Sequence, residues 1–205
     1  MKARSRPYNS PIRARHAEET KRSILEAARR LFAADGYTSA TMDAIAAAAE
    51  VSTPTVYASF KTKQRILAAL VTGAVGQPEI RKLAAAAEGE MDPERRIRKA
   101  AHVMRLAIEA EAPMLRVLWQ AGESDPDLVD AWRQMHANRQ RRLTEVLAPI
   151  TSGTARGRLV DIAWACGSPE IFRLLVLERG WTPKQYEDWL AVSMLNAHRA
   201  GSNAG

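Results

Sequence analysis

Residues 41–63 constrain the fold of this chain more than any other segment. They read TMDAIAAAAEVSTPTVYASFKTK, two short helix-favouring runs separated by a polar turn. Ile45, Ala48 and Ala49 recur at the i, i+3, i+4 spacing that gives an amphipathic helix its apolar face. A helix, a tight turn and a second short helix rich in hydroxyls are typical of a helix-turn-helix that reads DNA.

The ends of these two helices follow from their terminal residues. The first is expected over residues 41–49, because Thr41 is a good N-cap and Asp43 places a carboxylate near the positive end of the helix dipole. The second is expected over residues 53–60, with Pro54 close to its start, where a missing N–H breaks no hydrogen bond.

The outward side chains of the second helix are small and polar. Val56 and Phe60 are expected to face the core, which leaves Thr53 and Thr55 pointing outward. A hydroxyl can meet either a donor or an acceptor on a base edge. The two threonines are therefore the candidate base contacts.

The residues around this second helix are candidates for the DNA backbone. Lys63 opens the next helix, whose dipole favours an anion at that end, and Tyr57 and Thr41 are candidates for the same role. Ser52, in the turn, completes the set of DNA-binding candidates. Two alternatives remain open: Tyr57 as a half-buried ring that supports the fold, and Thr41 as a plain N-cap.

An ordered series of residues extends this pattern in both directions. It comprises Ile24, Leu25, Ala28, Leu31, Phe32, Asp35, Gly36, Tyr37, Thr38, Thr41, Ile45, Ala46, Val51, Ser52, Thr53, Pro54, Thr55, Val56, Tyr57, Phe60, Lys63, Ile66 and Leu67. The series resembles the DNA-binding domain of the tetracycline-repressor (TetR) family of bacterial regulators. One residue departs from the family pattern: Glu50 stands where a glycine usually eases the turn through a positive φ. Glu50 must accept a strained backbone or change the turn, and its charge would repel phosphates.

The resemblance implies an all-α chain with an N-terminal three-helix helix-turn-helix domain and a C-terminal helical bundle for ligand binding and dimerisation. Residues 1–17 would be a flexible basic arm, residues 18–72 the DNA-binding domain, and residues 73–205 the ligand-binding and dimerisation domain. The implied function is a dimeric transcriptional regulator, most simply a repressor that a small, largely apolar ligand releases from its double-stranded DNA operator. The alternative is an architectural or adaptor protein that binds DNA without a small-molecule ligand.

Positive charge is concentrated at the N-terminal end. The formal net charge is +7, and residues 1–70 hold 12 Lys or Arg against 6 Asp or Glu. Such a basic surface suits phosphate binding. Arg13 and Arg15, in the proline-containing arm, are candidates for minor-groove or phosphate contacts, as in homeodomain arms. The alternative is a disordered tail that only aids solubility.

Apolar stretches near the C-terminus favour a dimer. Residues 159–166 and 171–177 are apolar around most of a helical circumference, so they require burial on two sides. A bundle and a second subunit together provide that burial. The candidate interface residues, on two final helices, are Ile171, Leu174, Leu175 and Trp189. The alternative is a monomeric bundle that buries these residues in its own core.

The central helices carry soft and aromatic side chains suited to an apolar pocket. The candidate ligand-binding residues are Met104, Trp119, Trp132 and Met135, although each taken alone is more simply a core residue. The candidate polar contacts are His102, His136, Glu123 and Asp125, with His102 more simply a hydrogen-bonded core histidine. The residues expected on a solvated face are Arg139, Arg141 and Arg142. A break between helices is expected at residues 111–113, because of Pro113.

Other classes of protein are disfavoured. The sequence contains no nucleophile elbow, phosphate-binding loop or dinucleotide fingerprint, and its histidines form no metal-ligand pair. We therefore expect neither an enzyme nor a bound metal or cofactor. Cys166 is the single cysteine, which excludes an internal disulfide and suits a reducing compartment. Since no apolar run reaches membrane-spanning length, the chain is expected in the cytoplasm.

Overall fold

The computed structural model describes residues 11–72, 77–121 and 126–202. Within these ranges all regular structure is helical, which confirms the all-α prediction. No helix of the described ranges combines the length and the apolar content needed to span a membrane.

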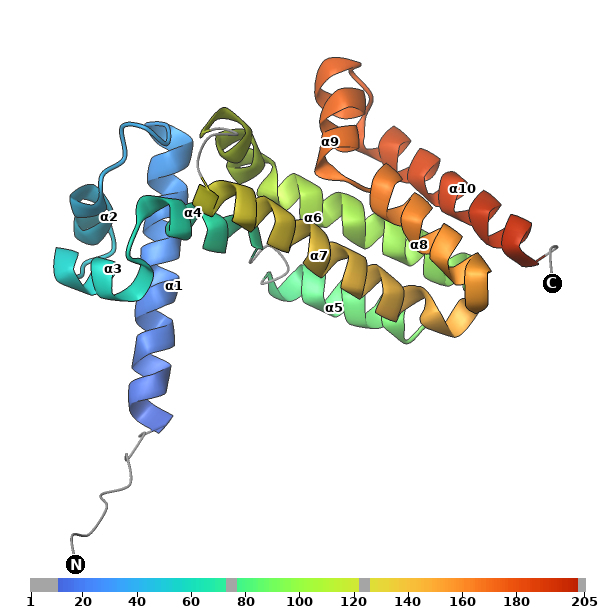
Figure 1. The fold of residues 1–205 in the computed structure, drawn as a ribbon, viewed down its shortest axis with the longest axis horizontal. Helices are drawn as coiled ribbons and strands as arrows, with labels where there is room; N and C mark the ends of the chain where they lie inside the picture. The colour runs from blue at the N-terminus through green and yellow to red at the C-terminus, as the bar shows by residue number, and fades with distance from the viewer. Residues whose placement is uncertain (1–10, 73–76, 122–125, 203–205) are drawn as a thin grey trace, which may run out of the picture.

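The helices divide into two groups, α1–α4 at one end of the molecule and α5–α10 at the other (Figure 1). Their bounds are α1 Pro11–Ala34, α2 Met42–Ala48, α3 Thr53–Phe60, α4 Lys63–Thr72, α5 Pro78–Glu88, α6 Pro93–Ala121, α7 Pro126–Leu147, α8 Gly153–Cys166, α9 Pro169–Phe172 and α10 Pro183–Ser202. A 3-10 turn, Ala148–Ile150, follows α7, and a π-helical segment, Arg173–Glu178, follows α9.

The N-terminal group packs around an apolar cluster that also includes part of the bundle. Ile24 of α1, Ile45 of α2 and Val56 of α3 are fully buried in this cluster. Met114 of α6 and Leu128 of α7 belong to the same cluster. Because the two groups of helices share one core, a displacement of α6 changes the packing beneath the helix-turn-helix.

The C-terminal bundle has its own apolar core. Ile97 of α6, Leu147 of α7, Leu159 of α8 and Leu190 of α10 are fully buried there. α8 and α10 run side by side along the outer side of the bundle (Figure 1). The hydroxyl of Tyr186 on α10 donates a 2.9 Å hydrogen bond to the carbonyl of Cys166 at the end of α8. This bond fixes α10 against the end of α8.

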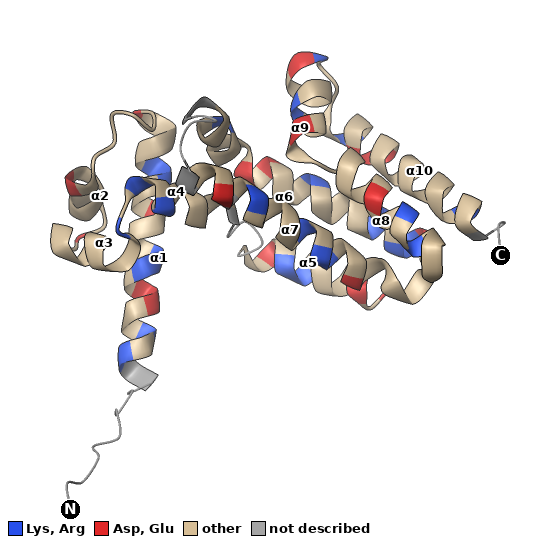
Figure 2. Ribbon diagram, in the orientation of Figure 1, with Lys and Arg blue, Asp and Glu red and all other residues tan. Residues whose placement is uncertain are grey.

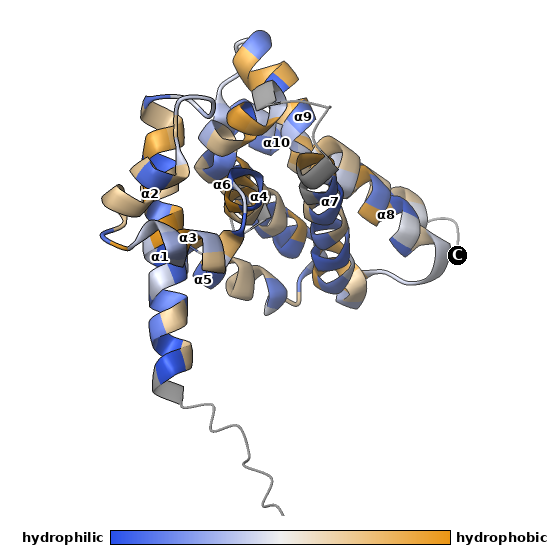
Figure 3. Ribbon diagram, turned by 60° about the vertical axis from the view of Figure 1, so that its left-hand side comes forward, coloured by the Kyte–Doolittle hydropathy of each residue, from blue (hydrophilic) through white to orange (hydrophobic). Residues whose placement is uncertain are grey.

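The first helix begins earlier than the sequence indicated. It starts at Pro11, so all of the described part of the expected flexible arm, residues 11–17 of 1–17, is helical. Proline fits the first turn of a helix, where its missing N–H has no partner to lose. Residues 13–19 are exposed, and this end of α1 is strongly hydrophilic (Figure 3). A helix without an apolar face gives no periodicity from which its start could be predicted.

The expected break at residues 111–113 is absent. α6 runs through Pro113 as one helix. A proline inside a helix costs about 3 kcal/mol, because it removes one hydrogen bond and its ring meets the preceding turn. Met114 and Leu115, directly after the proline, are buried in the two apolar clusters. Burial of these side chains offsets the local penalty.

The helical region after α8 restarts at Ser168-Pro169. α8 ends at Cys166, and the hydroxyl of Ser168 accepts a 3.3 Å hydrogen bond from the backbone N–H of Ile171 as the N-cap of α9. α9 and the π-helical segment rise away from α8 and α10 (Figure 1).

Candidate nucleic-acid interface and central cavity

Both helices of the helix-turn-helix are capped, α2 by Thr41 as the sequence predicts and α3 by Ser52 of the turn. The hydroxyl of Thr41 accepts a 3.1 Å hydrogen bond from the backbone N–H of Ala44, and α2 follows directly. Ser52 caps α3, where its hydroxyl accepts from the backbone N–H of Thr55 at 3.4 Å. Both helices are thus held at their N-terminal ends by side chains, which fixes the orientation of the short α3.

The turn between these helices contains a strained residue. Glu50 has a φ of 56°, in the left-handed region that favours glycine. The backbone N–H of Val51 donates to the carbonyl of Ala46 at 3.0 Å, so the turn closes α2 in the ordinary way. Of the two outcomes expected for Glu50, the structure shows the strained backbone.

Replacing Glu50 with glycine should therefore stabilise the protein by about 1 kcal/mol, since the left-handed conformation has no steric cost for glycine. It should also raise DNA affinity, because a negative charge is removed. Thermal unfolding and a DNA titration check the two effects separately. Glu50→Gln is the matched control, because it removes the charge and keeps the strain. Equal stability of the two variants would contradict the strain argument.

Hydrogen bonds between side chains hold α2, the turn and α3 together. The hydroxyl of Thr53 donates to the carboxylate of Asp43 at 2.8 Å. The hydroxyls of Ser52 and Thr55 share a bond of 2.8 Å. Each hydroxyl oxygen can take part in more than one hydrogen bond, so these groups retain capacity for a base edge. The structure thus brings Ser52, Thr53 and Thr55 together on one short segment.

Tyr57 follows on the same helix, and its side chain is 50% exposed. Thr41, whose hydroxyl is used as the N-cap, is exposed at the start of α2. Arg13 and Arg15 are also exposed, but the turns of α1 that carry them project beyond α3 (Figure 1). Figure 2 shows several basic residues along α1 and few on α2 and α3. Basic residues thus line α1 and follow α3, whereas α2 and α3 themselves carry no lysine or arginine.

Lys63 has an environment that the sequence did not indicate. Its ammonium donates to the carbonyls of Tyr37 at 2.7 Å, Thr38 at 3.3 Å and Ala40 at 2.9 Å. It also lies 4.4 Å from the centre of the Tyr37 ring. Burial lowers the pKa of this ammonium. An ammonium has three N–H donors, and here all three meet the loop between α1 and α2. The structure therefore gives Lys63 a positioning role in place of a free phosphate contact.

Lys63→Met should destabilise the protein by about 1–3 kcal/mol, because three loop carbonyls lose their shared donor. Lys61→Met is the matched control, since Lys61 is exposed and loses the same charge. Chemical unfolding measures the stabilities, and the salt dependence of DNA binding shows whether either lysine neutralises a phosphate. Equal stability of the two variants, with a reduced salt dependence for Lys63→Met alone, would restore the phosphate role.

A central cavity of about 320 Å³ lies within the bundle. Its walls come from α5, α6 and α7, with Val71 of α4 at one side and Gly167 and Pro169 from the α8–α9 region. Met104 and Met135, two of the four expected ligand-binding residues, are on the wall. The apolar residues that complete it include Ala100, Val103, Ala107, Ile108, Leu115, Leu143 and Val146.

The other two expected ligand-binding residues do not line this cavity. Trp119 and Trp132 contact each other edge to face, with ring centres 6.3 Å apart. Trp132 also meets His136 at 4.9 Å, and His136 meets Trp164 at 5.4 Å. These rings form an aromatic row that joins α6, α7 and α8. A helical repeat shows which residues face inward, but not which of them meets a cavity.

Several polar residues also line the wall, and the sequence had not indicated this position for any of them. They are Glu88, Glu111, Asn138, Arg139, Arg142 and Glu145. The expectation of a solvated face is wrong for Arg139, whose guanidinium donates to the carbonyls of Gly167 at 2.6 Å and Trp164 at 3.0 Å. Burial lowers the pKa of Arg139. A charged side chain can join two helices through free carbonyls at a helix end, and charge patterning gives no sign of this.

His102 and His136 each meet a carboxylate. His102 is hydrogen-bonded, as expected, with its Nδ1 2.9 Å from Glu187 of α10, but it is only partly buried and so is not a core histidine. Arg105 donates to the same carboxylate at 2.9 Å. The Nε2 of His136 lies 3.0 Å from Glu170. The two acidic candidates, Glu123 and Asp125, lie outside the described residues. None of the described residues forms a group of His, Cys, Asp or Glu suited to a metal ion.

The expected interface residues are divided between core and surface. Ile171, Leu175 and Trp189 are partly buried against the bundle core, whereas Leu174 is 40% exposed. Leu177 in the same π-helical segment and Val192 on α10 are also exposed. Large apolar side chains are thus exposed in the C-terminal region, which the sequence pattern had indicated.

The helix-turn-helix region matches a known family, and the fold of the chain resembles several solved structures. The model of the tetR family of bacterial regulatory proteins matches residues 24–70. No curated protein matches the chain. A putative TetR-family transcriptional regulator from Mesorhizobium loti is similar in structure, with a TM-score of 0.64 and 18% identity over 90% of this chain and 97% of that one. One from Syntrophomonas wolfei gives a TM-score of 0.67 and 17% identity over 88% and 95%.

A complex of SmeT with triclosan is also similar, with a TM-score of 0.64 and 19% identity over 87% of this chain and 90% of that one. At identities this low the structural likeness shows the fold alone, while the family match covers the helix-turn-helix with parts of the helices on either side of it. Residues 24–70 therefore carry the pattern of the tetR family of bacterial regulatory proteins, within a chain that shares the fold of structures described as TetR-family transcriptional regulators.

Proposed function

We propose that this protein is a dimeric transcriptional repressor that a small, largely apolar ligand releases from its DNA operator. One observation carries the proposal: the wall of the central cavity includes Val71 of α4, a residue that is also part of the core beneath the helix-turn-helix. A ligand in the cavity would contact the same packed cluster that positions α3.

The DNA-binding surface is proposed to be α3 with the turn before it. Thr53 and Thr55 are the candidate base contacts, while Ser52, Thr41 and Tyr57 are the candidates for contacts around them, including the DNA backbone. The remaining candidates, Arg13 and Arg15, would meet DNA outside the reach of α3. We place the DNA-binding domain within residues 18–72 and the ligand-binding and dimerisation domain within residues 73–205. A chain that acts on the chromosome would work in the cytoplasm.

The ligand is proposed to occupy the central cavity. Methionine side chains adapt to ligands of different shape, and the wall is mostly apolar with a few polar groups. SmeT, which has a similar fold, is known in complex with triclosan.

Dimerisation is proposed through the C-terminal region. A single helix-turn-helix contacts few base pairs, so two copies at a fixed spacing are needed for a specific site. Leu174, Leu177 and Val192 leave apolar surface exposed in the single chain, and a second copy would cover it.

Ligand binding would act by a population shift. The free protein would favour the spacing of the two α3 helices that fits the operator, and the ligand would favour another spacing. The shift can be no larger than the difference in affinity of the ligand for the two conformations. Because α4 and α6 contribute to both the cavity wall and the N-terminal core, they are the elements that would move.

A gel-shift titration with the DNA upstream of its own gene tests the DNA-binding part of this proposal. We expect a complex that survives excess unrelated DNA. An apolar compound that binds the cavity should dissociate it. If the complex forms and no member of a chemically diverse set of apolar compounds dissociates it, the architectural or adaptor alternative is favoured. If no complex forms at low ionic strength, the proposal fails.

Thr55→Ala should lower the discrimination between the operator and a shuffled sequence by about 1–3 kcal/mol, the range for a lost base contact. Ser59→Ala is the matched control, since it removes a hydroxyl from the same helix. Fluorescence anisotropy with both DNA fragments measures the discrimination. Unchanged discrimination in Thr55→Ala would remove Thr55 from the base-reading surface.

A further inference from the structure

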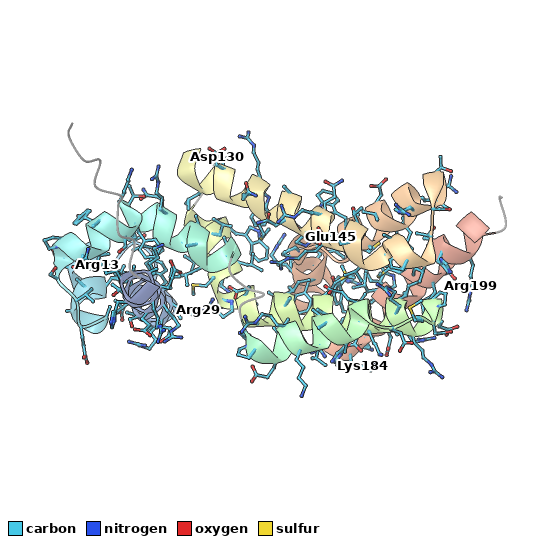
Figure 4. The ribbon with its side chains drawn as sticks, turned by 90° about the horizontal axis from the view of Figure 1, so that it is seen from below. Arg13, Arg29, Asp130, Glu145, Lys184 and Arg199 are labelled. Atoms are coloured by element: carbon cyan, nitrogen blue, oxygen red, sulfur yellow. The ribbon has the colours of Figure 1, made fainter. Side chains whose placement is uncertain are left out.

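Glu111 of α6 belongs to two sites at once. It lines the central cavity, and its carboxylate accepts two hydrogen bonds from the guanidinium of Arg29 on α1, at 3.0 and 3.2 Å. A second nitrogen of Arg29 lies 3.5 Å from the carbonyl of Ala110. Arg29 lies on the side of α1 that faces the bundle (Figure 4). An ion pair therefore joins the cavity wall directly to the first helix of the DNA-binding domain.

The surroundings of Glu111 make it an unusual part of this wall. Its side chain is 4% exposed, whereas the other two wall carboxylates, Glu88 and Glu145, are themselves exposed. The wall residues Ile108 and Leu115 flank it on α6, one turn to either side, and both are apolar. Glu111 is thus a buried anion on a mostly apolar wall.

The charge of Glu111 is only partly compensated. Burial raises the pKa of this carboxyl, and the bond to Arg29 acts in the opposite direction without cancelling the effect. Arg29 itself is 37% exposed, so water weakens its attraction for Glu111. Of the two wall arginines, Arg139 is engaged by two carbonyls and Arg142 is exposed to water. A further positive charge entering the cavity would find in Glu111 a desolvated partner.

We propose that Glu111 couples the cavity to the DNA-binding domain, and that the ligand is an organic cation with an apolar body. The positive group of the ligand would take the Glu111 carboxylate from Arg29, while its apolar part fills the cavity. Loss of the ion pair would leave α1 without its polar attachment to α6, so the N-terminal helices could change orientation. This inference deepens the proposed function and rests on it.

Two probe ions of almost the same size and shape test the ligand class. Tetraphenylphosphonium is a cation and tetraphenylborate an anion, and calorimetry measures the binding of each to the full chain without DNA. We expect the cation to bind at least about tenfold more tightly than the anion, and Glu111→Gln to remove about tenfold of the cation affinity. Glu79→Gln is the matched control, because Glu79 is exposed on α5 and lies outside the cavity wall.

Equal affinity for the two ions, no binding of the cation, or equal losses in Glu111→Gln and Glu79→Gln would each overturn the assignment of Glu111. The coupling is tested by adding tetraphenylphosphonium to the complex with upstream DNA. The wild type should be released, whereas Glu111→Gln should bind DNA more weakly and respond at least about tenfold less to the cation. Cation binding that leaves the DNA complex intact would refute the coupling.

These outcomes are separable from a failure of the proposed function. If the wild type binds no DNA, the repressor proposal fails while the calorimetric comparison still reports on Glu111. If the wild type binds DNA and Glu111→Gln behaves like Glu79→Gln in both experiments, the inference fails and the repressor proposal stands.

Discussion

Leu174→Arg should convert a dimer into monomers and weaken operator binding by about 100-fold or more, because linked half-sites gain at least that much from simultaneous contact. Leu174 is exposed on the π-helical segment after α9, within the apolar surface proposed to meet the second chain. A guanidinium buried there without a partner would lose its hydration, and the interface would open. Sedimentation velocity measures the assembly state, and a gel-shift titration measures the affinity.

The matched control for this prediction is Leu83→Arg. Leu83 lies on α5 and has a similar exposure, 38% against 40%, but it is remote in sequence from the C-terminal helices. We expect Leu83→Arg to remain dimeric and to bind DNA as the wild type does. A dimeric Leu174→Arg variant would place the interface on another face of the molecule.

Arg29→Met should destabilise the protein by about 1–3 kcal/mol, because it leaves the buried Glu111 carboxylate without its donor. Glu111→Gln should instead leave the free energy of unfolding unchanged or raise it, because it removes an ionised group whose burial is unfavourable. The pair would thus serve the orientation of α1 more than the stability of the fold. Urea unfolding of both variants at neutral pH measures the difference.

The pH dependence of stability follows from the direction of the Glu111 shift. Burial raises the pKa of Glu111 above its value in the unfolded chain, so the folded state binds the proton more tightly. The stability contributed by this carboxyl is fully present at acidic pH, below the unfolded pKa, and is lost as pH rises through the folded pKa. Removing Arg29 raises the folded pKa further. The penalty of Arg29→Met should therefore be larger at neutral than at mildly acidic pH.

Arg22→Met is the control for Arg29→Met, since Arg22 is an exposed arginine on the same helix. Its unfolding should match that of the wild type at every pH. Equal stability of the Arg22 and Arg29 variants would show that the ion pair with Glu111 contributes nothing to folding.

The helix-turn-helix could be predicted in detail because its signals are local. Thr41 and Ser52 cap their helices through bonds to backbone groups three residues away, and Pro54 marks the start of α3. The unusual position of Glu50 could be recognised in the same way, although the choice between a strained backbone and a different turn came from the structure. Such features depend on a few neighbouring residues, so the sequence carries them almost completely.

The central site could be predicted only as a region. Met104 and Met135 line the cavity, while Trp119 and Trp132 pack against each other, and all four belong to apolar faces of helices. The choice between wall and core depends on how the helices are placed, which periodicity does not determine. The continuation of α6 through Pro113 is likewise set by burial of the residues after it.

The least predictable features were polar groups with partners far away in the sequence. Lys63 binds carbonyls of the loop after α1, Arg139 binds carbonyls at the end of α8, and Glu111 binds Arg29. In the sequence each of these residues is one charge among many. Their roles come from burial and from partners that only the folded chain brings within hydrogen-bond distance.

Selection from a pool of random double-stranded DNA, followed by sequencing, tests the central claim most directly. Two α3 helices held by one C-terminal scaffold should enrich a sequence with two inverted half-sites, their centres separated by about one helical turn or a whole number of turns. Wild-type protein at low ionic strength is the material to use. Enrichment of an unrepeated half-site, or of no sequence at all, would contradict the account.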